Sequence, residues 1–394
     1  MTKLLYIYES YEPTNAEFYN LILHAKNYAE FEVISKECMK ITPEDLQWCD
    51  VIISVRSTSE YEWRLAKYAK SLGKYWALMI DDDFLSLRAN YGKDGQGYRP
   101  KKKKCLLKIL QYVDCLVVVN DLLGQKYIRL CNTDRYILTN TSFDISHMES
   151  PHLNSEKVKI VYYVNDGTQE MFDLYLRTIF PKLCAKYADK IELYFMAVKP
   201  NMDEYEGKLK YYYVPHMSYE AFLTYMREQH FDIGLAPLDD RGFSKYKYFN
   251  KYVEYTRAGI AGIYTDCALY RQVIQSDYNG ILCDNSAESW IMAIEKLVDN
   301  PDIRIRIAEN AQKYASENFG QEEVTRKFLQ NFPEMASYKA PEKNVSQFKF
   351  GIIRIHYYFF RVGGWMYTIW SCIRNGNIKS LIPRFRSKIL KRSN

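Results

Sequence analysis

The chain has 394 residues, of which 47% are hydrophobic and 26% charged, so it is long enough for two globular domains with sizeable cores. This composition excludes a disordered or fibrous protein. The nine cysteines include no C-x-x-C pair and the six histidines no H-x-x-x-H spacing, which argues against a zinc site and a disulfide framework. The first residues contain too few apolar positions for a signal-peptide core, so we expect a chain that begins in a reducing cytosol.

The formal net charge of +6 conceals an uneven distribution. Residues 343–394 carry eleven Lys or Arg and no Asp or Glu, so the first 342 residues have a net charge of −5. The acidic body and the absence of a base-stacking signature argue against nucleic acid as a partner. The strongly basic tail therefore needs a separate explanation.

In chain order, apolar runs of strand length alternate with amphipathic helical stretches, as in parallel sheets with crossover helices. The first series predicts strands at 4–8, 31–35, 50–55, 75–81, 115–120 and 135–140, and helices at 15–28, 60–72 and 105–112. The second series predicts strands at 158–164, 190–198, 209–214, 232–238, 260–266 and 280–283. Its helices are expected at 170–187, 219–229, 249–258, 287–297 and 302–332.

These elements predict an α/β protein with two Rossmann-like domains that face a cleft. The N-terminal domain is expected at 1–145 and the C-terminal domain at 158–335, with a polar linker at 146–157. The last helix of the second domain, about 321–333, is expected to cross back to the first domain. Ligands of such sheets bind at the carboxyl ends of the strands.

The stretch 232–266 carries the clearest chemical signal. It predicts a buried strand, a polar loop, a helix, a glycine stop and another buried strand. The loop and the helix start bring together Ser244, Lys245, Lys247 and Asn250, where the helix dipole and free N–H groups attract phosphate. Glu254 lies one turn beyond Lys251 and supplies an acceptor for a ribose diol. From these residues alone, a solvated basic helix with one i,i+3 ion pair remains an alternative.

The same stretch resembles the donor-binding domain of GT-B glycosyltransferases, close to glycosyltransferase family 4 and the group 1 bacterial enzymes. Those relatives often read D-I-G-x-A-P-L, a short loop, then Lys-x-x-Glu-Tyr and Gly. The matching residues here are Asp232, Ile233, Gly234, Ala236, Pro237, Leu238, Phe243, Lys247, Lys251, Glu254, Tyr255 and Gly259. Residues 278–319 are similar as well, and the resemblance covers roughly residues 1–335.

The resemblance implies a role for each matching polar residue. It assigns Glu254 to the ribose and Lys247 to the diphosphate, and it makes both of them candidate catalytic residues. The remaining candidate donor-binding residues are Ser244, Lys251, Tyr270, His216 near the base, and Asp166, Gly167 and Thr168 in the turn after the first strand of the domain. For a loop histidine such as His216, simple exposure is the alternative. The family's usual first glutamate is replaced by Tyr246, which leaves the transferred sugar open.

Three consecutive aspartates, Asp81 to Asp83, follow a predicted strand of the N-terminal domain. A D-x-D site for Mg²⁺ is one interpretation. In GT-B enzymes, however, lysines and helix dipoles stabilise the leaving diphosphate, so we expect no metal and no cofactor beyond a nucleotide diphosphate sugar, with UDP or GDP. Asp82 and Asp83 are candidate catalytic residues that contact acceptor hydroxyls or assist proton transfer. Capping of the loop by these aspartates is the alternative.

The tail at 343–394 combines aromatic and basic residues. Too many charges lie within 351–374 for a spanning helix, but the spacing of its apolar residues suits an amphipathic helix in a membrane interface. The basic residues that follow favour anionic lipid headgroups. Packing of this helix on the body is the alternative.

Together, these features predict a glycosyltransferase of the hexosyltransferase type, peripheral on the inner face of the plasma membrane. Its acceptor is expected to be membrane-held, a lipid-linked glycan of surface polysaccharide assembly, and the resemblance implies retention at the anomeric carbon without metal. Two alternatives remain from the residues. One is a non-catalytic scaffold with this fold at the membrane, and the other is a sugar-nucleotide epimerase.

Overall fold

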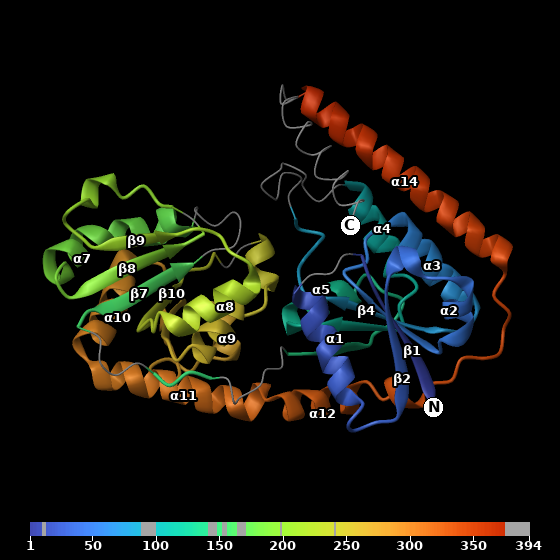
Figure 1. The fold of residues 1–394 in the computed structure, drawn as a ribbon, viewed down its shortest axis with the longest axis horizontal. Coiled ribbons are helices and arrows are strands. Elements are labelled where there is room, and N and C mark those ends of the chain that lie inside the picture. Colours follow the sequence, from blue (N-terminus) through green and yellow to red (C-terminus); the bar gives the residue numbers. More distant parts are fainter. Residues whose placement is uncertain are drawn as a thin grey trace.

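The structure, a computed structural model, describes residues 1–9, 13–87, 100–140, 148–151, 156–163, 171–197, 199–239 and 242–374. It contains two six-stranded sheets, each flanked by helices (Figure 1). The strand orders are β2-β1-β3-β4-β5-β6 and β12-β11-β10-β7-β8-β9. All neighbouring strands run parallel. The predicted pair of Rossmann-like sheets is therefore confirmed.

The first sheet is built from nearly continuous apolar runs, because helices cover both of its faces. Its strands are β1 (Thr2–Tyr8), β2 (Phe31–Glu37), β3 (Val51–Val55), β4 (Tyr75–Ile80), β5 (Cys115–Val118) and β6 (Tyr136–Leu138). Its helices are α1 (Pro13–Ala25), α2 (Pro43–Trp48), α3 (Glu60–Ser71), α4 (Pro100–Ile109) and α5 (Asp121–Ile128). Capping boxes begin α2 at Thr42 and α3 at Ser59.

The second sheet follows the same plan. Its strands are β7 (Val158–Tyr163), β8 (Ile191–Met196), β9 (Tyr211–Val214), β10 (Ile233–Ala236), β11 (Ala261–Thr265) and β12 (Ile281–Cys283). Its helices are α7 (Phe180–Tyr187), α8 (Tyr219–Glu228), α9 (Asn250–Arg257), α10 (Ala287–Asp299) and α11 (Pro301–Phe319). A short 3₁₀ turn at Gly242–Tyr246 precedes α9.

Several helices differ from the sequence-based prediction. The helices α2 and α5 were not predicted, because their six and eight residues are too short to show a helical period. The predicted helix at 170–187 is interrupted by a π turn at Phe172–Leu176 and a 3₁₀ turn at Arg177–Ile179. Pro181 explains the interruption, since its nitrogen has no hydrogen to donate to the carbonyl of Arg177.

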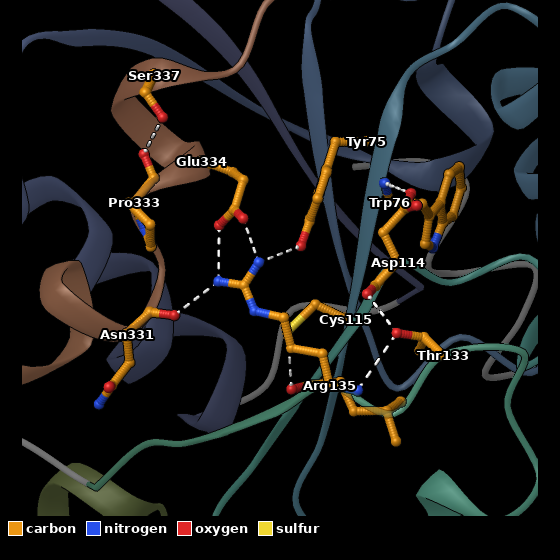
Figure 2. A network of polar contacts seen from close by, with 11 residues as sticks. Tyr75, Trp76, Asp114, Cys115, Thr133, Arg135, Asn331, Pro333, Glu334 and Ser337 are labelled. Atoms are coloured by element: carbon orange, nitrogen blue, oxygen red, sulfur yellow. Dashed lines mark hydrogen bonds and ion pairs between the residues drawn. The ribbon is translucent and has the colours of Figure 1, made fainter.

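Helix α12 (Gln321–Asn331) continues from α11 and lies against α1 of the N-terminal domain (Figure 1). The short helix α13 (Glu334–Ser337) then packs near β1. Figure 2 shows how this segment is held: the Arg135 guanidinium donates to the Asn331 carbonyl at 2.9 Å and forms a two-pronged ion pair with Glu334. Tyr75 joins the same guanidinium at 3.1 Å. The end of the second half of the chain is therefore anchored on the first sheet.

Helix α14 (Gln347–Arg374) lies along α3 and then extends past the body of the domain (Figure 1). Its first turns pack on the N-terminal core through Phe350 and Ile353, which are buried. Large side chains farther along are exposed, including Ile355, Phe359 and Met366. Within the part of the chain that the structure describes, no helix combines the length and apolar character needed to cross a membrane.

Candidate functional site

Two lysines are brought together where the 3₁₀ turn of residues 242–246 meets the start of α9. The Lys251 ammonium lies 5.0 Å from the ring centroids of both Tyr162 and Tyr163 at the carboxyl end of β7. The Lys247 ammonium lies 5.3 Å from the Phe243 ring. Among the described residues, neither ammonium forms a hydrogen bond or an ion pair with a carboxylate. The site therefore holds two ammonium groups whose hydrogen-bond donors are not used by a described carboxylate, with Asp82 as a nearby charge that acts on Lys247 without a direct contact.

Burial and mutual repulsion both act on these lysines. Burial, followed by the charge of Lys247, lowers the pKa of Lys251 to about 7. Burial also lowers the pKa of Lys247, and the nearby Asp82 carboxylate partly opposes this effect. An anion placed between the two ammonium groups would stabilise their charged forms. The arrangement is therefore suited to a phosphate or diphosphate group.

Glu254 is buried on α9, one turn beyond Lys251, and does not form the i,i+3 ion pair that was the alternative interpretation. Its Oε2 atom is shielded from solvent and has no hydrogen-bond partner within the described residues. Burial, followed by the nearby Glu17 carboxylate, raises the pKa of Glu254 to about 8. An unsatisfied buried acceptor is costly unless a ligand supplies the donor.

Gly259 and Asp232, two residues of the sequence motif, have structural roles beside the site. Gly259 follows the helix at φ 67°, a left-handed conformation that suits glycine. A Cβ atom there would stand 2.6 Å from the Glu149 carbonyl oxygen. Asp232, at the start of β10, accepts from the Lys159 backbone N–H at 2.8 Å and pairs with Arg304 at 3.1 Å. These motif residues are thus structural supports of the site.

The three aspartates of the N-terminal domain have different surroundings. Asp81 forms a two-pronged ion pair with Arg56, which has a positive φ of 52°. Asp82 is only partly buried; desolvation, followed by the charge of Asp81, raises its pKa to about 7. The attraction between Asp82 and Lys247 crosses from one domain to the other.

Asp83 differs from the sequence-based expectation of an acceptor contact. It is fully buried, and its two oxygens accept from Lys126 at 2.5 Å and from the Tyr127 hydroxyl at 3.2 Å. Asp83 therefore holds its own loop, which corresponds to the capping alternative. Of the two aspartates named as candidates, Asp82 is the one whose side chain is partly exposed and lies near Lys247.

The remaining predicted donor-site residues are more scattered. Ser244 is half-buried in the 3₁₀ turn, and its carbonyl accepts from the Lys247 N–H at 3.3 Å. His216 is exposed in the loop after β9. Tyr270 is buried, with its ring 4.9 Å from that of Tyr264, so it belongs to the core of the C-terminal domain. Asp166, Gly167 and Thr168 lie outside the described residues.

Two further contacts join the domains and were not predicted. The Tyr219 hydroxyl of α8 donates to Glu17 of α1 at 3.4 Å, and the Arg257 charge acts on Glu17 as well. The Asn120 side chain donates to the Lys247 carbonyl at 3.0 Å. No sequence signal identifies these residues, because each meets its partner only through the arrangement of the domains. Within the described ranges, no group of three or more His, Cys, Asp or Glu is placed to hold a metal ion.

No family model and no curated protein matches the sequence. The fold, in contrast, matches solved structures. HepE from Anabaena in complex with UDP and glucose aligns with a TM-score of 0.59 over 85% of this chain and 100% of its own, at 10% identity. Sucrose-phosphate synthase from Thermosynechococcus elongatus aligns at 0.57 over 85% and 99%, with 11% identity. A glycosyltransferase from Rickettsia africae aligns at 0.57 over 85% and 98%, with 12% identity. The chain therefore has the GT-B fold.

Proposed function

We propose that this protein is a glycosyltransferase that uses a nucleoside diphosphate sugar as donor. The observation that carries the proposal is the single turn of α9 that holds the unpaired Lys251 ammonium and the unpartnered Oε2 of Glu254, with Lys247 beside them. A ribose hydroxyl would donate to Glu254, and the diphosphate would lie between the lysines. UDP is the first choice of nucleotide, because HepE of the same fold was solved with UDP and with UDP-glucose.

The proposed reaction breaks the bond between the anomeric carbon and the diphosphate oxygen, and forms a bond from that carbon to an acceptor oxygen. Lys247 and Lys251 would stabilise the negative charge that grows on the departing diphosphate. The proton of the acceptor hydroxyl would pass to Asp82 or to the diphosphate. Asp82 is suited to this because it lies beside Lys247 and has a pKa near 7. Retention at the anomeric carbon remains part of the proposal on the family resemblance.

We further propose a membrane-held, lipid-linked glycan acceptor and a position on the inner face of the plasma membrane. Support comes from α14, whose exposed side chains Ile352, Ile355, Phe359, Met366 and Trp370 recur at helical spacing. Its described part carries only basic charges, and residues 343–394 contain no acidic side chain. A helix of this kind binds anionic lipid surfaces through apolar burial and charge attraction. Two copies of α14 packed against each other would bring like charges together and repel, which argues against self-association through this helix.

Donor binding is tested by thermal unfolding of the full chain with UDP, GDP, CDP or ADP. A ligand present at 100 times its Kd stabilises the native state by about 2.7 kcal/mol. We expect one nucleotide to raise Tm, and the rise to be lost in Glu254→Ala but retained in Glu288→Ala, which changes an exposed carboxylate of α10. If no nucleotide raises Tm, the non-catalytic scaffold becomes the better interpretation. Sugar transfer that requires an added acceptor separates the transferase from an epimerase.

Membrane binding is tested by cosedimentation of the full chain with vesicles of phosphatidylcholine, with or without phosphatidylglycerol. Binding is expected only with the anionic lipid and is expected to weaken with salt. Phe359→Glu, on the exposed face of α14, should reduce it severalfold. Met292→Glu changes an equally exposed apolar residue of α10 and should leave binding unchanged. Equal binding by both variants would contradict the role of α14.

A further inference from the structure

Asn120 caps a helix of one domain and at the same time holds the backbone of the other. Its Oδ1 accepts from the Leu122 N–H at 2.8 Å and so begins α5. Its Nδ2 donates to the Lys247 carbonyl at 3.0 Å, across 127 positions of the chain. Asn120 itself is buried. Because both ends of its amide are used, the position of Lys247 is tied to a rigid helix start in the N-terminal domain.

A second contact acts on the residue before Lys247. The Lys126 ammonium, on the same helix α5, lies 4.4 Å from the ring centroid of Tyr246. That ammonium also donates to Asp83 at 2.5 Å and to the Ser86 hydroxyl at 2.9 Å, so its own position is fixed. A cation over an aromatic face contributes about 0.5–1 kcal/mol at exposed sites and more when desolvated. Helix α5 therefore holds two consecutive residues of the donor-side loop.

One backbone hydrogen bond from the C-terminal domain also acts on Lys247. The Lys247 N–H donates to the Ser244 carbonyl at 3.3 Å, at the long end of the hydrogen-bond range, and α9 begins only at Asn250. A side chain must be held closely to stabilise a charge that develops during a reaction, and helices hold it better than loops do. The contacts from α5 supply this support.

We propose that Asn120 and Lys126 are positioning residues through which the N-terminal domain sets Lys247 for the donor diphosphate. This inference rests on the proposed function. It implies that the diphosphate half of the donor is bound by the two domains jointly through Lys247, whereas the hydrogen bond of Asn120 and the ring contact of Lys126 do not extend to Glu254 at the nucleoside half. Loss of the contacts from Asn120 and Lys126 would then loosen the diphosphate and leave Glu254 unchanged.

Asn120→Ser is the direct test. Serine preserves the helix cap and the neutral charge, but its side chain is too short to reach the Lys247 carbonyl. In the full chain, we expect the Kd for UDP, measured by titration calorimetry, to rise about two- to tenfold, the equivalent of one hydrogen bond. The Kd for uridine should not change. Asn132→Ser is the matched control, because Asn132 donates to the Gln111 carbonyl at 3.0 Å within the N-terminal domain.

Tyr246 gives an independent variant on the other side of the interface. Tyr246→Leu removes the ring over Lys126 without touching Asp83, and we expect a weaker affinity for UDP and an unchanged affinity for uridine. Tyr246→Phe keeps the ring and should behave as the wild type. Parallel losses of UDP and uridine affinity in these variants would overturn the positioning role, since they would indicate a general structural defect.

Hydrogen exchange of the nucleotide-free chain separates the inference from the proposed function. In Asn120→Ser, the amides of residues 244–250 should exchange faster than in the wild type, with α10 as an unchanged reference. If the wild type binds no nucleotide but this acceleration is seen, the proposed function fails and the interdomain support of Lys247 remains. Unchanged exchange and an unchanged ratio of UDP to uridine affinity would together refute the inference.

Discussion

Gly234 of β10 lies directly against the ring of Tyr255 of α9: a Cβ atom at position 234 would stand 2.5–2.6 Å from three ring atoms. The Tyr255 hydroxyl donates to the Leu235 carbonyl at 2.8 Å, so the ring is fixed along the strand. Two residues of the D-I-G and Lys-x-x-Glu-Tyr patterns therefore form one packing unit. This contact fixes α9, which carries Lys251 and Glu254, against the sheet.

Gly234→Ala is expected to destabilise the protein by about 1–3 kcal/mol, because the buried ring of Tyr255 has no free space to move into. The free energy of unfolding is measured by urea denaturation. Gly351→Ala is the matched control, since a Cβ atom at that helical position meets no atom within 4 Å. It should be neutral or slightly stabilising. Equal stability of both variants would show that the second domain rearranges to make room for the Cβ atom at position 234.

Lys251 predicts a pH dependence of diphosphate binding. Its pKa of about 7 in the free protein means that binding of a diphosphate, which favours the ammonium, takes up a proton above pH 7. The affinity for UDP relative to uridine should therefore fall as pH rises from 7.5 to 9.5, by at most about tenfold per pH unit. Titration of Glu254 should change the affinities for UDP and for uridine alike, so it does not change their ratio.

Calorimetry in buffers of different ionisation enthalpy measures the proton uptake directly. In Lys251→Gln this ammonium is absent, so the ratio of UDP to uridine affinity should be low and should depend less on pH in this range, with Lys247, whose pKa is also lowered by burial, as the remaining ammonium. A wild-type ratio that stays constant across the range would contradict a titrating Lys251 at the diphosphate.

Removal of the Arg304 guanidinium should destabilise the second domain strongly. Its partner Asp232 is fully buried, and the loss of one member of a buried ion pair leaves an uncompensated charge. We expect Arg304→Met to cost about 3–5 kcal/mol of unfolding free energy. Arg306→Met, on the exposed face of the same helix, is expected within about 0.5 kcal/mol of the wild type. A small effect of Arg304→Met would mean that water reaches Asp232.

The ion pair of Arg135 and Glu334 is expected to fasten α13 to the first sheet. A double-mutant cycle with Arg135→Met and Glu334→Gln should give a coupling energy of about 1–2 kcal/mol, because the pair is two-pronged and shares Tyr75. The exposed pair of Arg326 and Glu322 on α12 is the reference, with at most about 0.5 kcal/mol expected. Similar values for both pairs would assign the docking of α13 to its apolar contacts alone.

The apolar periodicity predicted all twelve strands, most of them within two residues of their observed ends, and also the parallel arrangement of both sheets. This was possible because the alternation of buried runs and amphipathic stretches is imposed locally by the geometry of strands and helices. The predicted helix start near Cys105 was late by about one turn, since α4 begins at Pro100. The four lysines before Cys105 concealed the start of the helix.

The same difference between local and long-range contacts applies to the candidate site. Lys247, Lys251 and Glu254 could be named from the sequence, because one short helix and its preceding loop carry all three. The burial of Asp83 could not, since its partner Lys126 lies 43 positions away. The support of Lys247 by Asn120 joins positions 127 apart and likewise has no local signal.

The sequence by itself thus determined the fold class and the helix on which the proposed donor-site residues lie, because these depend on spacing along a few turns of chain. Only the tertiary structure decided which polar groups are already satisfied and which are free to meet a ligand. The physical reason is that a hydrogen bond or an ion pair is made between atoms that the fold brings together, whatever their distance along the chain. Asp83 and Glu254 are both buried carboxylates, and they differ in whether the fold supplies a partner for each oxygen.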